Sequence, residues 1–175
     1  MNDYVPISHR DNKTGTKLFE ILMPRFGLGV WQMDDNECKS SILHALHNGY
    51  RLIDTATAYG NENAVGEAIR SSKIPRDEIF VVTKLRRVHA TGFDETISQC
   101  RESLQRLGLD YVDLYLVHAP PENISVRGDV WEAMEACLKL GLTRSIGVSN
   151  YGISHLENMK EYATILPSVN QIEVH

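Results

Sequence analysis

Short apolar runs alternate with longer amphipathic segments along the chain from about residue 25 onward. The apolar runs are rich in Ile, Val, Leu and Tyr, and they do not alternate strictly with polar residues. Such runs are typical of strands covered on both faces, as in a parallel sheet. The pattern therefore predicts six strands, at Arg25–Val30, Tyr50–Asp54, Ile79–Lys84, Val112–His118, Thr143–Ser149 and Ser168–Glu173.

The segments between these strands carry apolar residues at helical spacing. Helices are predicted over residues 37–48, 94–107 and 128–140, and weaker ones after Gly60 and Gly152. Gly108 and Gly141 directly follow two of the helices, in the position where glycine commonly ends a helix. The expected apolar faces are Cys38, Ile42, Ala45 and Leu46, then Ile97, Cys100, Leu104 and Leu107, then Val130, Met134, Cys137 and Leu140.

Strand–helix units of about 30 residues favour a parallel α/β fold, either an open doubly wound sheet or a (β/α)₈ TIM barrel. An open sheet with a dinucleotide site would carry GxGxxG after its first strand, but the segment from Gly27 to Gln32 lacks the third glycine. Polar residues instead recur at the carboxyl ends of the strands, which is how barrel active sites are built. Because a complete barrel needs ~250 residues, we predict an incomplete (β/α)₈ barrel with about six strand–helix units.

Composition and charge narrow the class of protein. The 175 residues fit one domain, 1–175, in which residues 1–17 form a polar N-terminal segment without the apolar core of a secretory signal. A net charge of −5 argues against nucleic-acid binding and against an anionic membrane surface. No apolar stretch approaches ~20 residues, so no membrane-spanning helix is expected. Cys38, Cys100 and Cys137 form no CxxC pair, which predicts reduced thiols in a cytoplasmic protein and no metal site.

Four residues at or just after strand ends can together protonate an oxygen atom. An ammonium at the end of an apolar strand, such as Lys84, is costly unless it is paired, and Asp54 on the neighbouring strand is the expected partner. A buried cation near Tyr59 would stabilise the phenolate and make the phenol a proton donor near neutral pH. His118, on the next strand, could orient a substrate oxygen or share the proton.

The sequence resembles the aldo-keto reductase superfamily, whose fold is the (β/α)₈ barrel. The resemblance covers about residues 17–175, and its motifs occur in family order at strand–helix spacing. The matching stretches are Met23-Pro-Arg-Phe-Gly-Leu-Gly-Val-Trp31, Asp54-Thr-Ala-Thr-Ala-Tyr-Gly-Asn-Glu62, Val82-Thr-Lys84, Leu109-Asp-Tyr-Val-Asp-Leu-Tyr-Leu-Val-His118, Ser145-Ile-Gly-Val-Ser-Asn150 and Asn170-Gln-Ile-Glu173.

The resemblance implies NAD(P)H-dependent reduction of an aldehyde or ketone, with NADPH as the usual cofactor and NADH the less common one. It assigns the catalytic tetrad to Asp54, Tyr59, Lys84 and His118, with Tyr59 as the general acid. Asp54 also matches the cofactor site, and His118 the substrate site. The carboxamide of the nicotinamide would be held by Ser149, Asn150 and Gln171, and Trp31 would form an aromatic wall of the substrate pocket. After His118, where many members have an aromatic residue and then proline, this chain has Ala119-Pro120-Pro121, which removes one wall of the usual pocket.

Other interpretations of these residues remain open from the sequence. Taken singly, Asp54 could cap the following helix, Lys84 could be a strand-end lysine, and His118 could be a core histidine. For Ser149 and Asn150 the alternative is a turn and a helix cap. Because six units leave two of a barrel's eight unaccounted for, the alternative functions are a C-terminally truncated, inactive isoform or fragment, or a non-catalytic interaction protein built on the barrel. The sequence predicts no oligomeric state.

Overall fold

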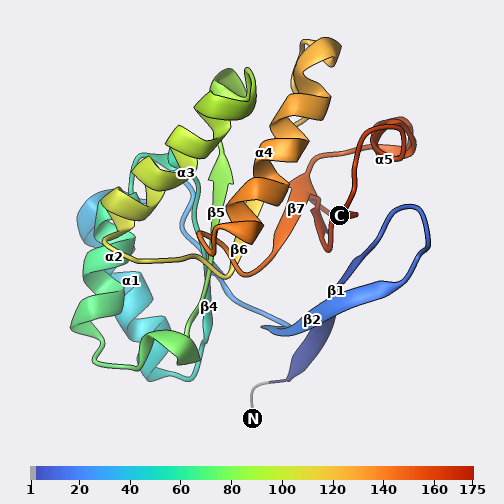
Figure 1. The fold of residues 1–175 in the computed structure, drawn as a ribbon. Helices are drawn as coiled ribbons and strands as arrows, with labels where there is room; N and C mark the ends of the chain where they lie inside the picture. Colours follow the sequence, from blue (N-terminus) through green and yellow to red (C-terminus); the bar gives the residue numbers. More distant parts are fainter. Residues whose placement is uncertain (1–2) are drawn as a thin grey trace.

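In a computed structural model that describes residues 3–175, six parallel strands form one sheet flanked by helices (Figure 1). The strands follow one another across the sheet in chain order, without the reversal that a doubly wound sheet shows at its switch point. This order confirms the predicted α/β class with successive barrel-type units. The strands are β3 (Leu28–Gly29), β4 (Leu52–Asp54), β5 (Phe80–Leu85), β6 (Leu114–Val117), β7 (Ile146–Ser149) and β8 (Asn170–Gln171).

The predicted helices are present, with ends that differ by at most a few residues. Leu140, assigned to an apolar face, is instead 57% exposed, because the helix predicted over residues 128–140 ends at Lys139. Gly108 has a φ of 63°, the left-handed conformation expected of a helix-ending glycine. The helices are α1 (Asp35–His47), α2 (Glu62–Ser71), α3 (Phe93–Leu107), α4 (Arg127–Lys139) and α5 (Ile153–Met159), with short 3₁₀ turns at Thr57–Tyr59, Arg76–Glu78, Arg87–His89 and Ile124–Val126.

A β-hairpin that the sequence pattern did not predict precedes the sheet. Its strands, β1 (Tyr4–Arg10) and β2 (Lys17–Pro24), pair antiparallel, so the polar segment predicted over residues 1–17 contains, from Tyr4 onward, the first strand and the turn of this hairpin. Ile7 and His9 are buried while their neighbours are not, which is a period of two. The alternation is easy to overlook because one of the buried positions holds a histidine rather than an apolar residue.

Two layers of buried apolar side chains pack against the sheet, one on each of its faces. The larger layer fills the space between the sheet and the helices, whereas the hairpin covers the other face of the sheet through Ile7, Ile21 and Met23. Figure 1 shows the blue hairpin on the side away from helices α1 to α3. On the hairpin side the sheet contributes Leu52, Phe80, Val82, Leu114, Leu116 and Val169.

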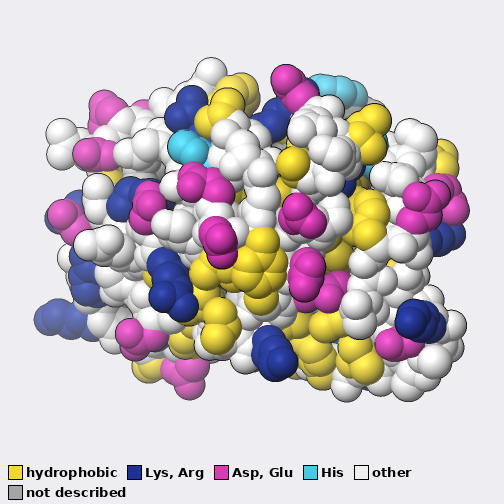
Figure 2. Space-filling model, turned by 45° about the horizontal axis from the view of Figure 1, so that its top comes forward, with side chains coloured by type: hydrophobic (Ala, Val, Ile, Leu, Met, Phe, Trp, Pro, Cys, Tyr) yellow, Lys and Arg dark blue, Asp and Glu magenta, His cyan; other side chains and the backbone are white. Residues whose placement is uncertain are grey.

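On the face drawn in Figure 2, charged side chains are not gathered by sign. Figure 2 shows acidic and basic groups interspersed on the face drawn, around hydrophobic side chains nearer its middle. Across residues 3–175, every helix is too short or too polar to cross a lipid bilayer.

Candidate active site

The carboxyl ends of the strands bring the predicted residues to one end of the sheet. Because side chains alternate between the two faces of a strand, a residue two positions beyond a hairpin-facing apolar residue faces the same side. This register stacks a polar layer directly above the apolar layer. The pairs are Leu52 with Asp54, Val82 with Lys84, Leu116 with His118, and Val169 with Gln171.

Lys84 is the centre of this polar layer. Its residue is fully buried, and Nζ donates hydrogen bonds to the Asp54 carboxylate, to the backbone oxygen of Thr55 at 3.0 Å and to Oη of Tyr59 at 3.2 Å. An ammonium has three hydrogens to donate, so all of them have acceptors. The pairing of Asp54 with Lys84 that the sequence predicts is present, and Tyr59 belongs to the same cluster.

Tyr59 lies outside the sheet, at the end of the Thr57–Tyr59 turn between β4 and α2. Gly60 follows in the left-handed conformation, with a φ of 76°, so the chain can reverse into α2 directly after the tyrosine. Asn61 is buried and closes the turn: its side chain accepts from Oγ1 of Thr55 and donates to the backbone oxygen of Val30, both at 2.9 Å. The phenol is thereby held above Lys84.

His118 stands beside the tyrosine at the end of β6. The two rings are arranged edge to face with centroids 5.7 Å apart. Burial lowers the pKa of His118 below its usual 6.5, and the nearby positive charge of Lys84 lowers the pKa further. The imidazole is therefore neutral at neutral pH and can donate one hydrogen bond and accept another.

A third group of polar side chains comes from β7, β8 and the residue after β7. Ser149 Oγ donates to the backbone oxygen of Gln171 at 3.0 Å, and Gln171 Nε2 donates to Asp54 at 2.9 Å. Asn150 has a φ of 61°, and its Nδ2 donates to the backbone oxygen of His118 at 2.9 Å. Within residues 3–175, no hydrogen bond occupies Oδ1 of Asn150 or Oε1 of Gln171. These two oxygens are available to accept from an amide group of a ligand.

Apart from Lys84, which lies beneath it, every predicted site residue lines one hollow of about 620 Å³. Trp31 is 66% exposed at its edge, so the indole can cover a ligand without being part of the core. The hollow is lined by Gly27, Leu28, Gly29, Trp31, Leu52, Asp54, Ala58, Tyr59, His118, Ser149, Asn150, Gln171, Ile172 and Glu173.

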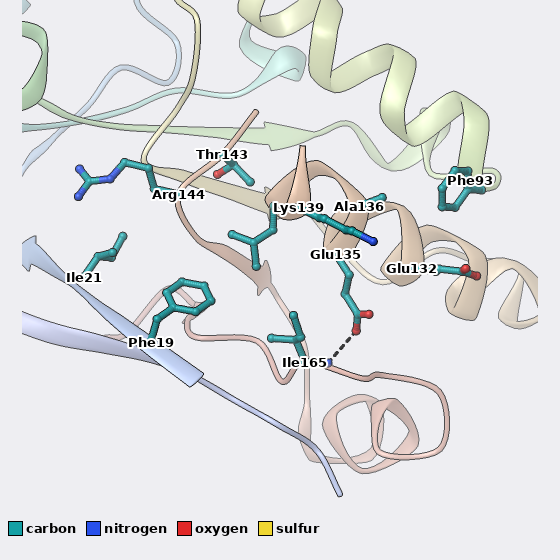
Figure 3. A pocket seen from close by; sticks show the side chains of 11 residues that line it. Phe19, Ile21, Phe93, Glu132, Glu135, Ala136, Lys139, Thr143, Arg144 and Ile165 are labelled. Atoms are coloured by element: carbon teal, nitrogen blue, oxygen red, sulfur yellow. Dashed lines mark hydrogen bonds between the residues drawn. The ribbon is translucent and has the colours of Figure 1, made fainter. Parts of the chain in front are cut away.

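A larger hollow of about 800 Å³ lies between β2 and α4 (Figure 3). Its walls are mainly apolar, including Phe19, Ile21 and Ile165. Glu135, one of the two acidic residues that line it, already accepts hydrogen bonds from two backbone N–H groups, those of Thr164 at 2.7 Å and Ile165 at 2.8 Å, and the second is drawn in Figure 3. None of the residues predicted for catalysis lines this hollow, so size alone does not identify the site.

Residues on α3 that the sequence pattern did not single out contact the segment around Tyr59. Ser103 is buried on the same helix face as Cys100, Leu104 and Leu107, and Arg106 follows it by three residues. The spacing of apolar residues along α3 does not identify such polar positions. Ser103 could have been identified from the sequence as a polar residue that shares the helical spacing of the apolar residues of α3.

The chain belongs to the Aldo/keto reductase family, whose sequence model matches residues 23–175. An aldo-keto reductase of Mycolicibacterium vanbaalenii is 52% identical over 153 residues, which are 87% of this chain and 54% of that protein. An aldo-keto reductase of Mycobacterium bovis is 49% identical over 156 residues, which are 89% of this chain and 55% of that protein. The chain thus spans about half the length of these curated relatives.

Solved structures have the same architecture. An aldo/keto reductase from Brucella melitensis superposes with a TM-score of 0.88 at 39% identity, covering 100% of this chain and 64% of that one. A Bombyx mori aldo-keto reductase, solved in complex with NADP, gives a TM-score of 0.83 at 33% identity and covers 99% of this chain and 59% of that one. The predicted family membership and barrel class are confirmed.

Proposed function

We propose that this chain forms the catalytic part of a reductase that uses NADPH, or less often NADH, to convert an aldehyde or ketone to an alcohol. The observation that carries the proposal is the cluster of Tyr59 Oη, the buried ammonium of Lys84 and the Asp54 carboxylate at the base of one hollow. A phenol beside a buried, paired cation is suited to release a proton to a substrate oxygen. Membership of the Aldo/keto reductase family supports the same reaction.

The side chains at the edge of the sheet suit the amide group of a nicotinamide. The free oxygens of Asn150 and Gln171 would accept from its amide N–H groups, and Ser149 Oγ contacts the Asn150 side chain and the backbone oxygen of Gln171. When bound, a reduced nicotinamide supplies the hydride that forms the new C–H bond at the carbonyl carbon. The NADP complex of the Bombyx mori relative supports this choice of cofactor.

The roles of the chain's own residues follow from their positions. Neutral His118 would donate a hydrogen bond that orients the carbonyl oxygen. As the carbon–oxygen π bond breaks, Tyr59 Oη would transfer its proton to that oxygen, and Lys84, 3.2 Å away, would stabilise the phenolate left behind. The phenolate then regains its proton from water, and Asp54 keeps the ammonium of Lys84 in place.

The first test removes the proton donor. Tyr59→Phe should lower kcat by at least ~10² while NADPH binding stays nearly unchanged, because the ring is retained and only the hydroxyl is lost. NADPH oxidation in the presence of simple aldehydes and ketones gives kcat, and quenching of the nicotinamide fluorescence gives the dissociation constant. Tyr111→Phe is the matched control, since Tyr111 lies against Arg76, outside the hollow.

Two results would count against the proposal. A Tyr59→Phe protein that kept most of its kcat would remove Tyr59 from the acid role. A folded wild-type chain that neither quenched nicotinamide fluorescence nor reduced any carbonyl compound would favour the non-catalytic alternatives.

A further inference from the structure

The segment that carries Tyr59 is attached to helix α3 at both of its ends. On one side of the tyrosine, Oγ1 of Thr57 lies 3.0 Å from Oγ of Ser103. On the other side, Oε2 of Glu62 accepts from Nε of Arg106 at 2.7 Å. Arg106 joins the two attachments, because its Nη2 also donates to Oγ of Ser103 at 3.1 Å. The guanidinium of Arg106 therefore holds the chain on both sides of Tyr59. We call this set of contacts, made by Thr57, Glu62, Ser103 and Arg106, the bracket.

The Glu62 end of this bracket is deeply buried. The side chain of Glu62 is 1% exposed, and its second oxygen accepts from Oγ1 of Thr83 at 2.6 Å. Thr83 immediately precedes Lys84 on β5, so the same carboxylate connects Arg106 to the strand that carries the lysine. The planar, forked guanidinium can make both contacts at once, whereas a lysine presents one point charge.

We propose that Arg106 is a positioning residue for Tyr59, acting through Ser103 and Glu62. It contacts neither the hollow nor the cluster around Lys84, so its effect is on where the phenol sits and how firmly it is held. A misplacement of about 1 Å at a reacting group can cost ~10²-fold in rate. The inference rests on the proposed function for its catalytic consequence, but the placement of Tyr59 can be measured without turnover.

The first experiment follows the ring of Tyr59 directly by NMR. In protein labelled with ¹³C at the Cζ atom of its tyrosines, the Tyr59 line is assigned by its loss in Tyr59→Phe. Arg106→Met should shift this line or split it into several, since the bracket is gone. Arg70→Met should leave it unchanged: Arg70 also links α2 to α3, through the backbone oxygen of Leu107 at 2.7 Å, but does not contact the Tyr59 segment.

The second experiment measures catalysis in the same variants. Arg106→Met should lower kcat at least ~10-fold and leave the NADPH dissociation constant unchanged, because the residues at the edge of the sheet are untouched. Arg106→Lys should recover only part of the loss, since an ammonium can pair with Glu62 without also holding Ser103. If Arg106→Met does not fold, Ser103→Ala decides the question, because it removes only the Thr57 arm of the bracket.

The outcomes separate this proposal from the proposed function. A shifted Tyr59 line without turnover in the wild type would support positioning and contradict the reductase assignment. An unchanged Tyr59 line in folded Arg106→Met, or in Ser103→Ala where the first variant fails to fold, would overturn the positioning role. A shift of the Tyr59 line in Arg70→Met as large as the shift in Arg106→Met would also overturn it. Such a result would show that any weakening of the contact between α2 and α3 displaces the ring.

Discussion

A buried ammonium is costly to maintain unless each of its hydrogens is used. Lys84 meets this condition with a carboxylate, a backbone oxygen and a phenol. Replacing a buried ion pair by apolar residues is often neutral or stabilising, so the pair is poor evidence of a stabilising role. An apolar replacement would not place a positive charge beneath Tyr59, as Lys84 does.

His9 is another fully buried titratable residue, at the opposite end of the sheet. Its Nε2 accepts from the backbone N–H of Ile146 at 3.2 Å, so the neutral ring carries its proton on Nδ1, which has no partner within residues 3–175. Burial lowers the pKa of His9 from 6.5 to about 4. Protonating Nε2 would break the bond that fastens the hairpin to the start of β7.

This burial predicts a pH-dependent stability. Because the folded-state pKa of His9 lies below its unfolded value, the stabilisation is complete above pH 6.5 and is lost as the pH falls toward about 4. Between neutral pH and the lower end of that window, the free energy of unfolding should drop by about 2 to 3 kcal/mol from this residue. Urea unfolding of wild type and His9→Gln across this range measures the difference. Equal pH dependence in both proteins would contradict the prediction.

At the scale of elements, the crossing of α2 over α3 is set by Gly66. A Cβ atom at this position would lie 1.8 Å from the backbone oxygen of Leu107. Every residue other than glycine would therefore clash with the backbone of α3. Glu62, one turn earlier on α2, then reaches Arg106, and Arg70, one turn later, reaches Leu107. The close approach of the two helices is what lets α3 contact the segment that carries Tyr59.

Gly66→Ala should therefore destabilise the protein although alanine is the better helix former. The gain in helix propensity is at most about 1 kcal/mol, whereas overpacking at a backbone contact costs about 1 to 3 kcal/mol, so a net loss is expected. Thermal unfolding gives the change in Tm. The matched control is Asn63→Ala on the exposed face of the same helix, which should be neutral or slightly stabilising. A Tm for Gly66→Ala at or above that of the control would contradict the close packing.

At the scale of the whole molecule, the strands of the sheet are not equally supported. Strands β5 and β6 have a paired neighbour on both sides and are entirely buried, whereas β3 and β8 lie at the two edges of the six-stranded sheet. The edge strands are also only two residues long. Opening an edge breaks fewer hydrogen bonds and exposes less apolar surface than opening the centre.

Hydrogen exchange of the 175-residue chain should follow this order. The amides of β5 and β6 should exchange most slowly, near the rate set by global unfolding, and those of β3 and β8 should exchange at least ~10-fold faster through local opening. Amide exchange followed by NMR or mass spectrometry measures both groups in one sample. Edge strands as well protected as the centre would show that β3 and β8 are held by contacts beyond the sheet itself.

Local patterns in the sequence were sufficient to predict the strand–helix units and the chemistry at the strand ends. Repeating apolar runs of strand length, helical spacing between them and Gly108 after α3 were enough to predict the strand–helix units, because each signal is local. The family motifs also indicated Asp54, Tyr59, Lys84 and His118, and the fold places all four in one cluster.

Contacts between residues far apart in the chain could not be predicted from these local patterns. The hairpin over Tyr4–Pro24 was missed because its inner face includes His9, which is buried through a bond to Ile146, 137 positions away. The role we propose for Arg106 was equally invisible, since its partners come from other helices and turns, such as Glu62, 44 positions earlier. Apolar periodicity reports what each segment buries, whereas the partner of a buried polar group depends on how the segments are packed together.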